Sequence, residues 1–276
     1  MQPIGHFLFD QEQALEYRGG NIEYQPAYPT TNEAIRWELN QVPPTGAQVL
    51  TVAASGDQPI FYKAAGAAHV DTFDITYCAR LIMDLKTYAL RVLDSHQYNV
   101  MLSHLENLAT AADRPELWTA ISQMPQRESG LITKMILQRP RAFGRGIAYN
   151  QNMPRPYEYQ RMRNTIDKPF NFIWSDIENV HKYLHQKYDI INISNIIDYV
   201  KRLPKIYNII SGLLPHLNAG GKIILTSSDC SNELLKRFIS KYPPQLGQST
   251  TVAVFDNTQI RNNPLGFCAI TITKTR

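Results

Sequence analysis

Residues 48–74 constrain the fold most, because two short apolar runs there flank a turn and a helix. The first run, 49–53, is rich in β-branched residues and has no polar break beyond one threonine. This character is typical of a strand buried on both faces of a parallel sheet. A helix is expected over 59–66, and the second run, 69–73, ends at Asp74. The order predicts the first half of a βαβ unit.

The connection after the first run is a turn with almost no side chains, formed by Ala53, Ala54, Ser55 and Gly56. Its backbone N–H groups can therefore approach a ligand closely. Asp74 follows after about 20 residues, the usual gap to an acid that accepts hydrogen bonds from ribose hydroxyls. We therefore predict a bound nucleoside, with Asp74 on its ribose. The alternative is a plain tight connection in which Asp74 only caps the helix beginning near Tyr77.

The glycine pattern narrows the type of cofactor. A dinucleotide fingerprint G-x-G-x-x-G is absent, since Gly56 is the one glycine in the turn, and no G-x-x-x-x-G-K-[ST] phosphate loop occurs in the chain. With dinucleotides and phosphate-loop ligands excluded, the expected cofactor contains a ribose but no phosphate that the turn must bind. S-adenosylmethionine fits that description.

The stretch VLTVAASGD, together with the end of the second strand and the helix after it, resembles a known family. It is similar to the S-adenosylmethionine:diacylglycerol 3-amino-3-carboxypropyl transferases of betaine-lipid synthesis, within the class I S-adenosylmethionine-dependent methyltransferase-like superfamily. Segments 189–200 and 213–228 resemble the fourth strand, and the Gly-Gly turn with the fifth strand, of such transferases. The matching positions in the first stretch are Val49, Leu50, Ala53, Ser55, Gly56, Asp57, Asp74, Ile75, Leu85 and Lys86.

Ordinary methyltransferases differ from the chain in this first motif. Thr51 stands where they usually carry an acid, and the positions of their usual glycines hold Ala53, Ser55 and Asp57. The resemblance therefore favours the aminocarboxypropyl branch. It implies a cofactor site made of Ala53, Ala54, Ser55, Gly56, Asp57, Asp74, Ile75 and Thr76.

The activity implied by the resemblance is transfer of the 3-amino-3-carboxypropyl group to a hydroxyl or amine, with release of methylthioadenosine. Two alternatives remain open: a methyltransferase, and a non-catalytic cofactor-binding or regulatory protein of the same fold. The expected acceptor is a small molecule or a lipid headgroup, with an anionic group as one option.

The alternation of strands and helices predicts an α/β fold with a doubly wound, mostly parallel seven-stranded sheet. The last two strands should be antiparallel neighbours, because the loop between them has no room for a crossover helix. Strands are expected near 48–53, 69–73, 170–174, 188–193, 221–227, 250–255 and 267–273, and helices at 59–66, 77–92, 177–186, 200–216 and 231–241.

Ligands of such sheets lie beyond the carboxyl ends of the strands. After the third strand, Ser175 and Asp176 are candidates for the adenine ring. After the fourth strand, Ser194 is a candidate cofactor residue, and the candidate catalytic residues are Asn195, Asp198 and Tyr199. For both sets the alternative is a helix start, with a hydroxyl, amide or carboxylate side chain as the cap.

The segment 95–168 is too long for a simple crossover, and it predicts a helical lid inserted into a single domain of residues 1–276. The segment from Arg127 to Lys168 contains nine basic and three acidic residues, a net charge of +6, whereas the net charge of the whole chain is +4. Such an excess of positive charge attracts anionic partners; the alternative is that it only keeps the surface of the insertion solvated. The stretch RPYEYQRMR interleaves aromatic residues with arginines, but without a recognised RNA module nucleic acid is an unfavoured partner.

Composition excludes several other classes. The three cysteines, Cys78, Cys230 and Cys268, are far apart and show no C-x-x-C, so neither a disulfide framework nor a cysteine zinc site is expected. His181 and His185 stand four apart without a third ligand, so no metal site is predicted. The start of the chain lacks a leader pattern and no run approaches 18 apolar residues, so a soluble cytoplasmic protein is the expectation.

Overall fold

The computed structural model describes residues 34–105, 114–138, 153–195, 200, 202–227, 237–238, 240, 250–256 and 268–275. The chain divides into two compact units. The first unit comprises residues 1–32, 53–64 and 72–175, and the second unit comprises residues 33–52, 65–71 and 176–276.

Seven strands form one sheet in the order β3-β2-β1-β4-β5-β7-β6. β4 pairs in parallel with β1 and with β5, whereas β7 lies antiparallel between β5 and β6. The strand order reverses between β1 and β4, as in a doubly wound sheet, so the predicted fold class is confirmed. The strands are β1 (Gln48–Val52), β2 (His69–Asp74), β3 (Asn171–Trp174), β4 (Tyr188–Asn192), β5 (Leu217–Ser227), β6 (Thr250–Asp256) and β7 (Cys268–Lys274).

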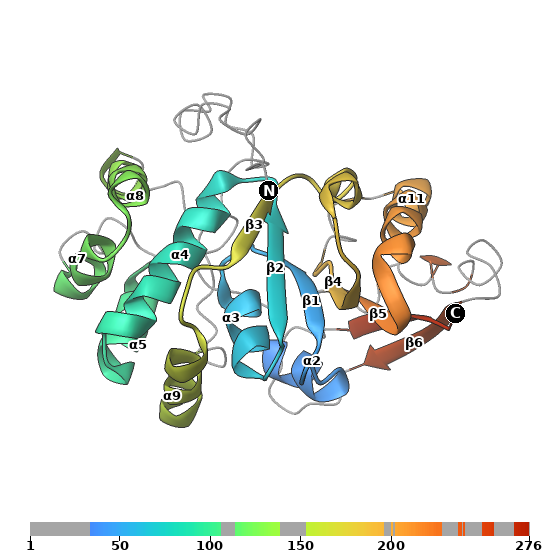
Figure 1. The fold of residues 1–276 in the computed structure, drawn as a ribbon, viewed down its shortest axis with the longest axis horizontal. Helices are drawn as coiled ribbons and strands as arrows, with labels where there is room; N and C mark the ends of the chain where they lie inside the picture. Colours follow the sequence, from blue (N-terminus) through green and yellow to red (C-terminus); the bar gives the residue numbers. More distant parts are fainter. Residues whose placement is uncertain are drawn as a thin grey trace. The chain divides into compact units, whose positions relative to one another are not determined.

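The core of the second unit forms around its central strands, whose sequences are almost uninterrupted apolar runs. Val49 and Leu50 of β1 and Ile191 of β4 are fully buried. Helix α11 (Leu203–Leu213), drawn in orange in Figure 1, buries residues three and four apart, as an amphipathic helix does. Those residues are Ile206, Ile209, Ile210 and Leu213. The unit also contains α2 (Ile35–Gln41) and two short 3-10 turns, η4 (Val180–Tyr183) and η5 (Leu214–His216).

The first unit holds the helices that follow β1 and β2 (Figure 1). Contacts join α4 to α7, α8 and α9, and α9 also packs on α3 and α5. The hydroxyl of Tyr159 donates to the carbonyl oxygens of Leu90 and Leu93 and so fixes α9 to the end of α4. These helices are α3 (Asp57–Ala64), α4 (Tyr77–Val92), α5 (Ser95–Leu105), α7 (Pro115–Ser122), α8 (Gln126–Gln138) and α9 (Pro156–Thr165).

The helical insertion between β2 and β3 is therefore confirmed, while its function as a lid stays a prediction. Among the described helices, none is long and apolar enough to cross a membrane.

Two sequence predictions about local structure are wrong. The helix expected over 177–186 is only the 3-10 turn η4, because Asp176 accepts hydrogen bonds from both the backbone and the side chain of Asn179 and closes a local turn. The Gly-Gly pair expected between a helix and the fifth strand lies inside β5. There the pairing with β4 shifts register, and Gly220 adopts φ +77°. The helix expected over 231–241 lies largely outside the described residues.

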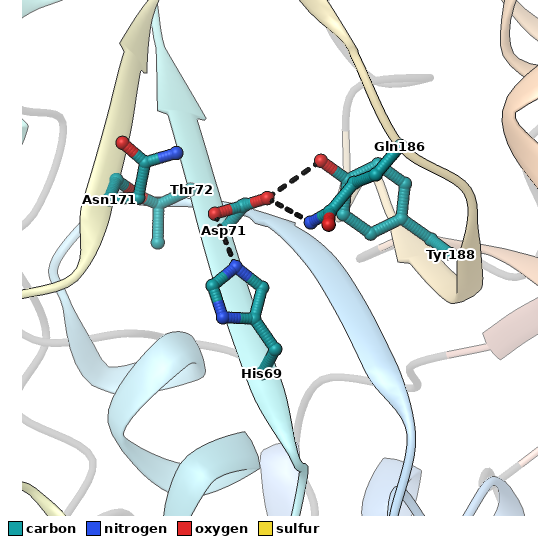
Figure 2. Close-up of polar contacts among 6 residues, drawn as sticks. All are labelled: His69, Asp71, Thr72, Asn171, Gln186 and Tyr188. Carbon is teal, nitrogen blue, oxygen red and sulfur yellow. Dashed lines mark hydrogen bonds and ion pairs between the residues drawn. The ribbon is translucent and has the colours of Figure 1, made fainter. Parts of the chain in front are cut away.

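A polar cluster in the second unit surrounds the buried Asp71 of β2 (Figure 2). Its Oδ1 lies 2.8 Å from Nε2 of His69, and its Oδ2 accepts hydrogen bonds from Gln186 at 2.6 Å and from the Tyr188 hydroxyl at 2.7 Å. Burial, and then the Asp71 carboxylate, raise the pKa of Tyr188, so the phenol stays protonated and donates. The cluster therefore satisfies a carboxylate buried within the sheet.

Replacing Tyr188 with Phe should lower the free energy of unfolding by about 1–3 kcal/mol, because the buried Asp71 carboxylate loses a donor. Urea unfolding measures this loss. Tyr157→Phe is the matched control: this ring is 63% exposed, and the change should stay within about 0.5 kcal/mol. Equal effects of the two variants would contradict a structural contribution from the cluster.

Candidate functional site

The turn after β1, residues 53–57, is held in an uncommon backbone conformation in the first unit. Ala54 has φ +43° and Gly56 has φ +81°. A Cβ atom at Gly56 would lie 2.7 Å from Cα of Met83, so α4 packs directly against the turn and only glycine fits. The backbone N–H of Gly56 donates to the carbonyl of Ala53 at 2.6 Å. The small residues that the sequence marked thus form a tight turn under α4.

Asp74, the last residue of β2, links this turn to the start of α4. Its Oδ2 accepts a hydrogen bond from the backbone N–H of Ala54 at 2.9 Å, and its Oδ1 accepts one from Thr76 at 3.0 Å. Thr76 is the N-cap of α4, since its side chain accepts from the N–H of Cys78. The alternative in which Asp74 caps this helix is therefore wrong. The carboxylate instead joins two segments that are 20 residues apart.

The Asp74 carboxyl is largely buried, with 9% of the residue exposed. Burial raises its pKa to about 6, against the opposing effect of the backbone N–H groups of Thr76, Ala54 and Ile75. At neutral pH the group is therefore mostly ionised and acts as an acceptor only. It is a charged acceptor held at the carboxyl end of a strand.

Beneath the turn lies a buried ion pair that sequence reasoning did not assign. Nζ of Lys86 lies 2.6 Å from Oδ1 of Asp57, and the two side chains are 0% and 8% exposed. The hydroxyl of Ser55 donates to the other carboxylate oxygen of Asp57 at 3.0 Å. Lys86 belongs to α4 and Asp57 begins α3, so the pair joins the two helices that flank the turn.

An apolar side chain is partly exposed beside Asp74 in the first unit: Ile75, at 39%. Its carbonyl accepts from the indole N–H of Trp174 at 2.8 Å, and the Trp174 ring packs 5.6 Å from the ring of Tyr77. The backbone N–H of Ser175 donates to the carbonyl of Asp74 at 3.0 Å. The structure thus brings Asp74, Ile75 and Ser175 together.

The remaining described candidates belong to the second unit. Asp176 accepts from the N–H of Asn179 at 2.9 Å and so closes a local turn ahead of η4, whose N-cap is Asn179. Ser194 has φ +54°, and its N–H donates to the side-chain oxygen of Asn192 at 2.8 Å. Its hydroxyl lies 3.4 Å from the side-chain oxygen of Asn195. Asp198 and Tyr199 lie outside the described residues.

Two further polar residues of the second unit were missed by sequence reasoning. The amide of Asn192, the last residue of β4, donates to the Glu38 carboxylate at 2.5 Å, and both side chains are buried. Glu38 lies on α2, where the sequence around it shows an ordinary helix. No spacing motif marks this residue, so only the fold reveals the contact.

In the described part of the chain, the strained non-glycine residues follow the two strands β1 and β4. Among the described residues, Ala54 and Ser194 are the two non-glycine residues with positive φ. One follows β1 and the other follows β4, strands that pair in parallel with Thr51 opposite Asn192. Backbone strain of this kind gathers at ligand sites, where the surrounding structure holds it. Both turns are therefore candidates for ligand contact.

No protein-family model matches the chain, and no curated protein matches it. Among solved structures it is similar to an rRNA methylase from Streptococcus thermophilus, with 11% identity, 90% of this chain and 99% of that chain covered, and a TM-score of 0.42. It is also similar to the N-methyltransferase NodS from Bradyrhizobium japonicum WM9, with 11% identity, coverage of 88% and 92%, and a TM-score of 0.41. A third is magnesium protoporphyrin IX methyltransferase from Synechocystis PCC 6803, with 11% identity, coverage of 87% and 79%, and a TM-score of 0.38. Likeness at these values carries no conclusion about activity.

The buried pair of Lys86 and Asp57 generates a stability prediction. Lys86→Met should lower the free energy of unfolding by about 3–5 kcal/mol, because it removes the ammonium group from a buried carboxylate. Adding Asp57→Asn should recover a large part of that loss, since the uncompensated charge is then gone. Denaturant unfolding of both single variants and the double variant measures the coupling. Strictly additive losses would contradict a direct pair.

Asp74 generates a prediction about pH. Its pKa is raised by folding from 3.8 to about 6, so its contribution to stability is fully present below pH 4 and is lost as pH rises through about 6. The stability of the wild-type protein relative to Asp74→Asn should therefore fall by about 2–4 kcal/mol between pH 4 and pH 7. Unfolding curves across this range test it, with the exposed Asp167→Asn as control. A difference that does not change with pH would refute the raised pKa.

Proposed function

We propose that the chain is an S-adenosylmethionine-dependent transferase whose first unit binds the ribose of the cofactor through Asp74. The observation that carries this proposal is the position of the Asp74 carboxylate, which accepts from the N–H groups of Ala54 and Thr76 at the end of β2. A carboxylate at the end of the second strand, after a small-residue turn, is the arrangement that binds ribose hydroxyls in nucleoside sites.

The acceptor capacity of Asp74 fits this role. An ionised carboxylate has about four acceptor positions, and the backbone N–H groups that hydrogen-bond to Asp74 are those of Ala54, Ile75 and Thr76. One acceptor position of the carboxylate is therefore left for a hydrogen-bond donor of the ligand. Ribose hydroxyls donate hydrogen bonds, and bonds to a charged group are stronger than those between neutral groups.

The surface beside Asp74 suits a nucleobase. Ile75 presents an exposed apolar side chain next to the carboxylate, and Trp174 fixes the backbone of this residue through its indole N–H. Covering Ile75 with a flat ring would remove apolar surface from water. We assign the edge of the adenine to Ser175 and Asp176, which follow β3 directly.

The group transferred is, in our proposal, the 3-amino-3-carboxypropyl group. Asp57 stands where the glycine of ordinary methyltransferases is usual, and here it is held by the buried Lys86 and by Ser55. An acid fixed in this way is an integral part of the turn, so the departure from the glycine pattern supports the aminocarboxypropyl branch. Methyl transfer is the second candidate, because a seven-stranded sheet with an antiparallel last strand is usual for both kinds of transferase.

The bound cofactor supplies electrophilic carbons next to a positive sulfur, and orientation decides which carbon reacts. In our proposal, Ala53, Ala54, Ser55, Gly56 and Thr76 position the cofactor together with Asp74. The acceptor is a hydroxyl or amine on a small molecule or an anionic headgroup. Asn195, Asp198 and Tyr199 are assigned to bind it, with the Asp198 carboxylate as the group that takes up its proton.

Incubation of the protein with S-adenosylmethionine and fractionated cell extract, followed by mass spectrometry of the nucleoside product, tests the proposal. Methylthioadenosine is the expected product. S-adenosylhomocysteine would instead establish methyl transfer. If neither product forms and calorimetry detects no cofactor binding, the transferase assignment is wrong.

Asp74→Asn is the matched variant for this experiment, because it keeps the shape of the side chain but removes its charge. Calorimetry should show weaker cofactor binding by about 1–3 kcal/mol, the usual value of a hydrogen bond to a charged group. Asp167→Asn, an exposed carboxylate of the same unit, should bind as the wild type does. Thermal melts of both variants exclude a loss of binding that comes from unfolding.

A further inference from the structure

A basic surface without carboxylate partners lies on α9, on the residues that flank it and at the end of α4, in the first unit. It comprises Arg91, Arg155, Tyr157, Arg161, Arg163 and Lys168, and we call it the α9 face. We propose that the α9 face binds single-stranded nucleic acid. The inference goes beyond the proposed transferase activity, because it concerns a separate surface and a binding partner that needs no cofactor.

The positive charge of the α9 face is not neutralised by side chains. In the described part of the chain, none of its five cations forms an ion pair. Arg163 instead donates to the carbonyl of Arg91 at 3.3 Å, and Arg91 donates to the carbonyl of Asp167. These contacts orient the guanidinium groups but leave their charge available. Such a cluster attracts phosphates and releases their counterions on binding.

Acidic residues on this face are fewer than the cations, and two of them already accept a backbone hydrogen bond. The Glu158 carboxylate accepts from the backbone N–H of Arg155 at 2.7 Å, which caps the start of α9. Asp94, just after α4, is exposed and accepts from the backbone N–H of Gln97 at 2.8 Å. Asp167 is exposed beside Lys168. Five cations therefore face three carboxylates.

Aromatic rings stand among these cations. Tyr157 is 63% exposed, the highest value among the described large hydrophobic residues, and its hydroxyl lies 3.4 Å from Nη1 of Arg155. The guanidinium of Arg91 lies 5.0 Å from the centre of the Tyr88 ring. An exposed ring among arginines suits stacking on bases, which every base permits because each has a π-face.

The chemistry of α9 favours nucleic acid over a membrane surface. Four of the five cations are arginines, whose planar groups bind phosphate through two parallel hydrogen bonds. The apolar side chains of the helix, Tyr159 and Met162, are buried against the unit, so no apolar stripe is left to enter a bilayer. The amide of the exposed Gln160 donates to that of Asn164 at 2.9 Å, and the further donor and acceptor positions of the two amides can hydrogen-bond to base edges.

Fluorescence anisotropy with labelled oligouridylate and oligothymidylate of about 12 nucleotides, a length within the usual site size, tests the proposal without cofactor. The wild-type protein should bind both, or the RNA alone if ribose hydroxyls contribute. Arg155→Glu with Arg161→Glu should weaken binding at least tenfold and should lower the salt slope by about 1.4, since each lost phosphate contact removes about 0.7. Tyr157→Ala should weaken binding by about 5- to 100-fold with an unchanged salt slope, because stacking is not electrostatic.

The matched control is Arg114→Glu with Arg127→Glu, two exposed arginines at the starts of other helices in the insertion. This variant carries the same change of charge and should bind as the wild type does. Equal weakening by both double variants would overturn the proposal in favour of general attraction. Binding to anionic vesicles without binding to either oligonucleotide would also overturn it. Because no cofactor is present, these outcomes are independent of whether the transferase proposal holds.

Discussion

The hydrogen bonds of the Asp74 carboxylate are the constraint on which the candidate site depends. They tie the turn after β1 to the start of α4, although the two segments are distant in sequence. The positive φ of Ala54 is unfavourable for a residue with a Cβ atom. It persists because the N–H of this residue is held by a buried charged acceptor. The same carboxylate thus fixes the turn and presents a charge at the end of β2.

Helix α4 supplies the second half of this arrangement. It packs on Gly56 so closely that a methyl group would not fit, and it places Lys86 against Asp57 under the turn. A buried ion pair is not by itself a gain in stability, since removing two charges from water is costly. Its effect here is on geometry: the pair specifies how α3 and α4 meet around residues 53–57. Both flanking helices therefore hold the turn in one conformation.

The sequence predicts the strands well because each is a short apolar run bounded by turn residues, as β1 and β4 illustrate. It also places Asp74, because the gap between a turn and an acid can be counted. It does not predict the contact between Lys86 and Asp57, since a lysine on a helix is normally solvated. The failure at 177–186 has a similar cause: the apolar spacing indicates a helix, but the local bonds of Asp176 to Asn179 compete with it. Glu38 and Asn192 are close only in the folded chain.

The hydrogen bonding of the turn also decides what kind of cofactor it can hold. In phosphate-binding turns, free backbone N–H groups point at the ligand. Here the N–H of Ala54 is used by Asp74 and that of Gly56 by the carbonyl of Ala53. The turn moreover sits against the Asp74 carboxylate, which would repel a phosphate. Ribose hydroxyls, by contrast, are donors and carry no charge. The missing glycines thus correspond to a structural difference: the Asp74 carboxylate beside this turn offers hydrogen-bond acceptors, whereas a phosphate loop offers donors.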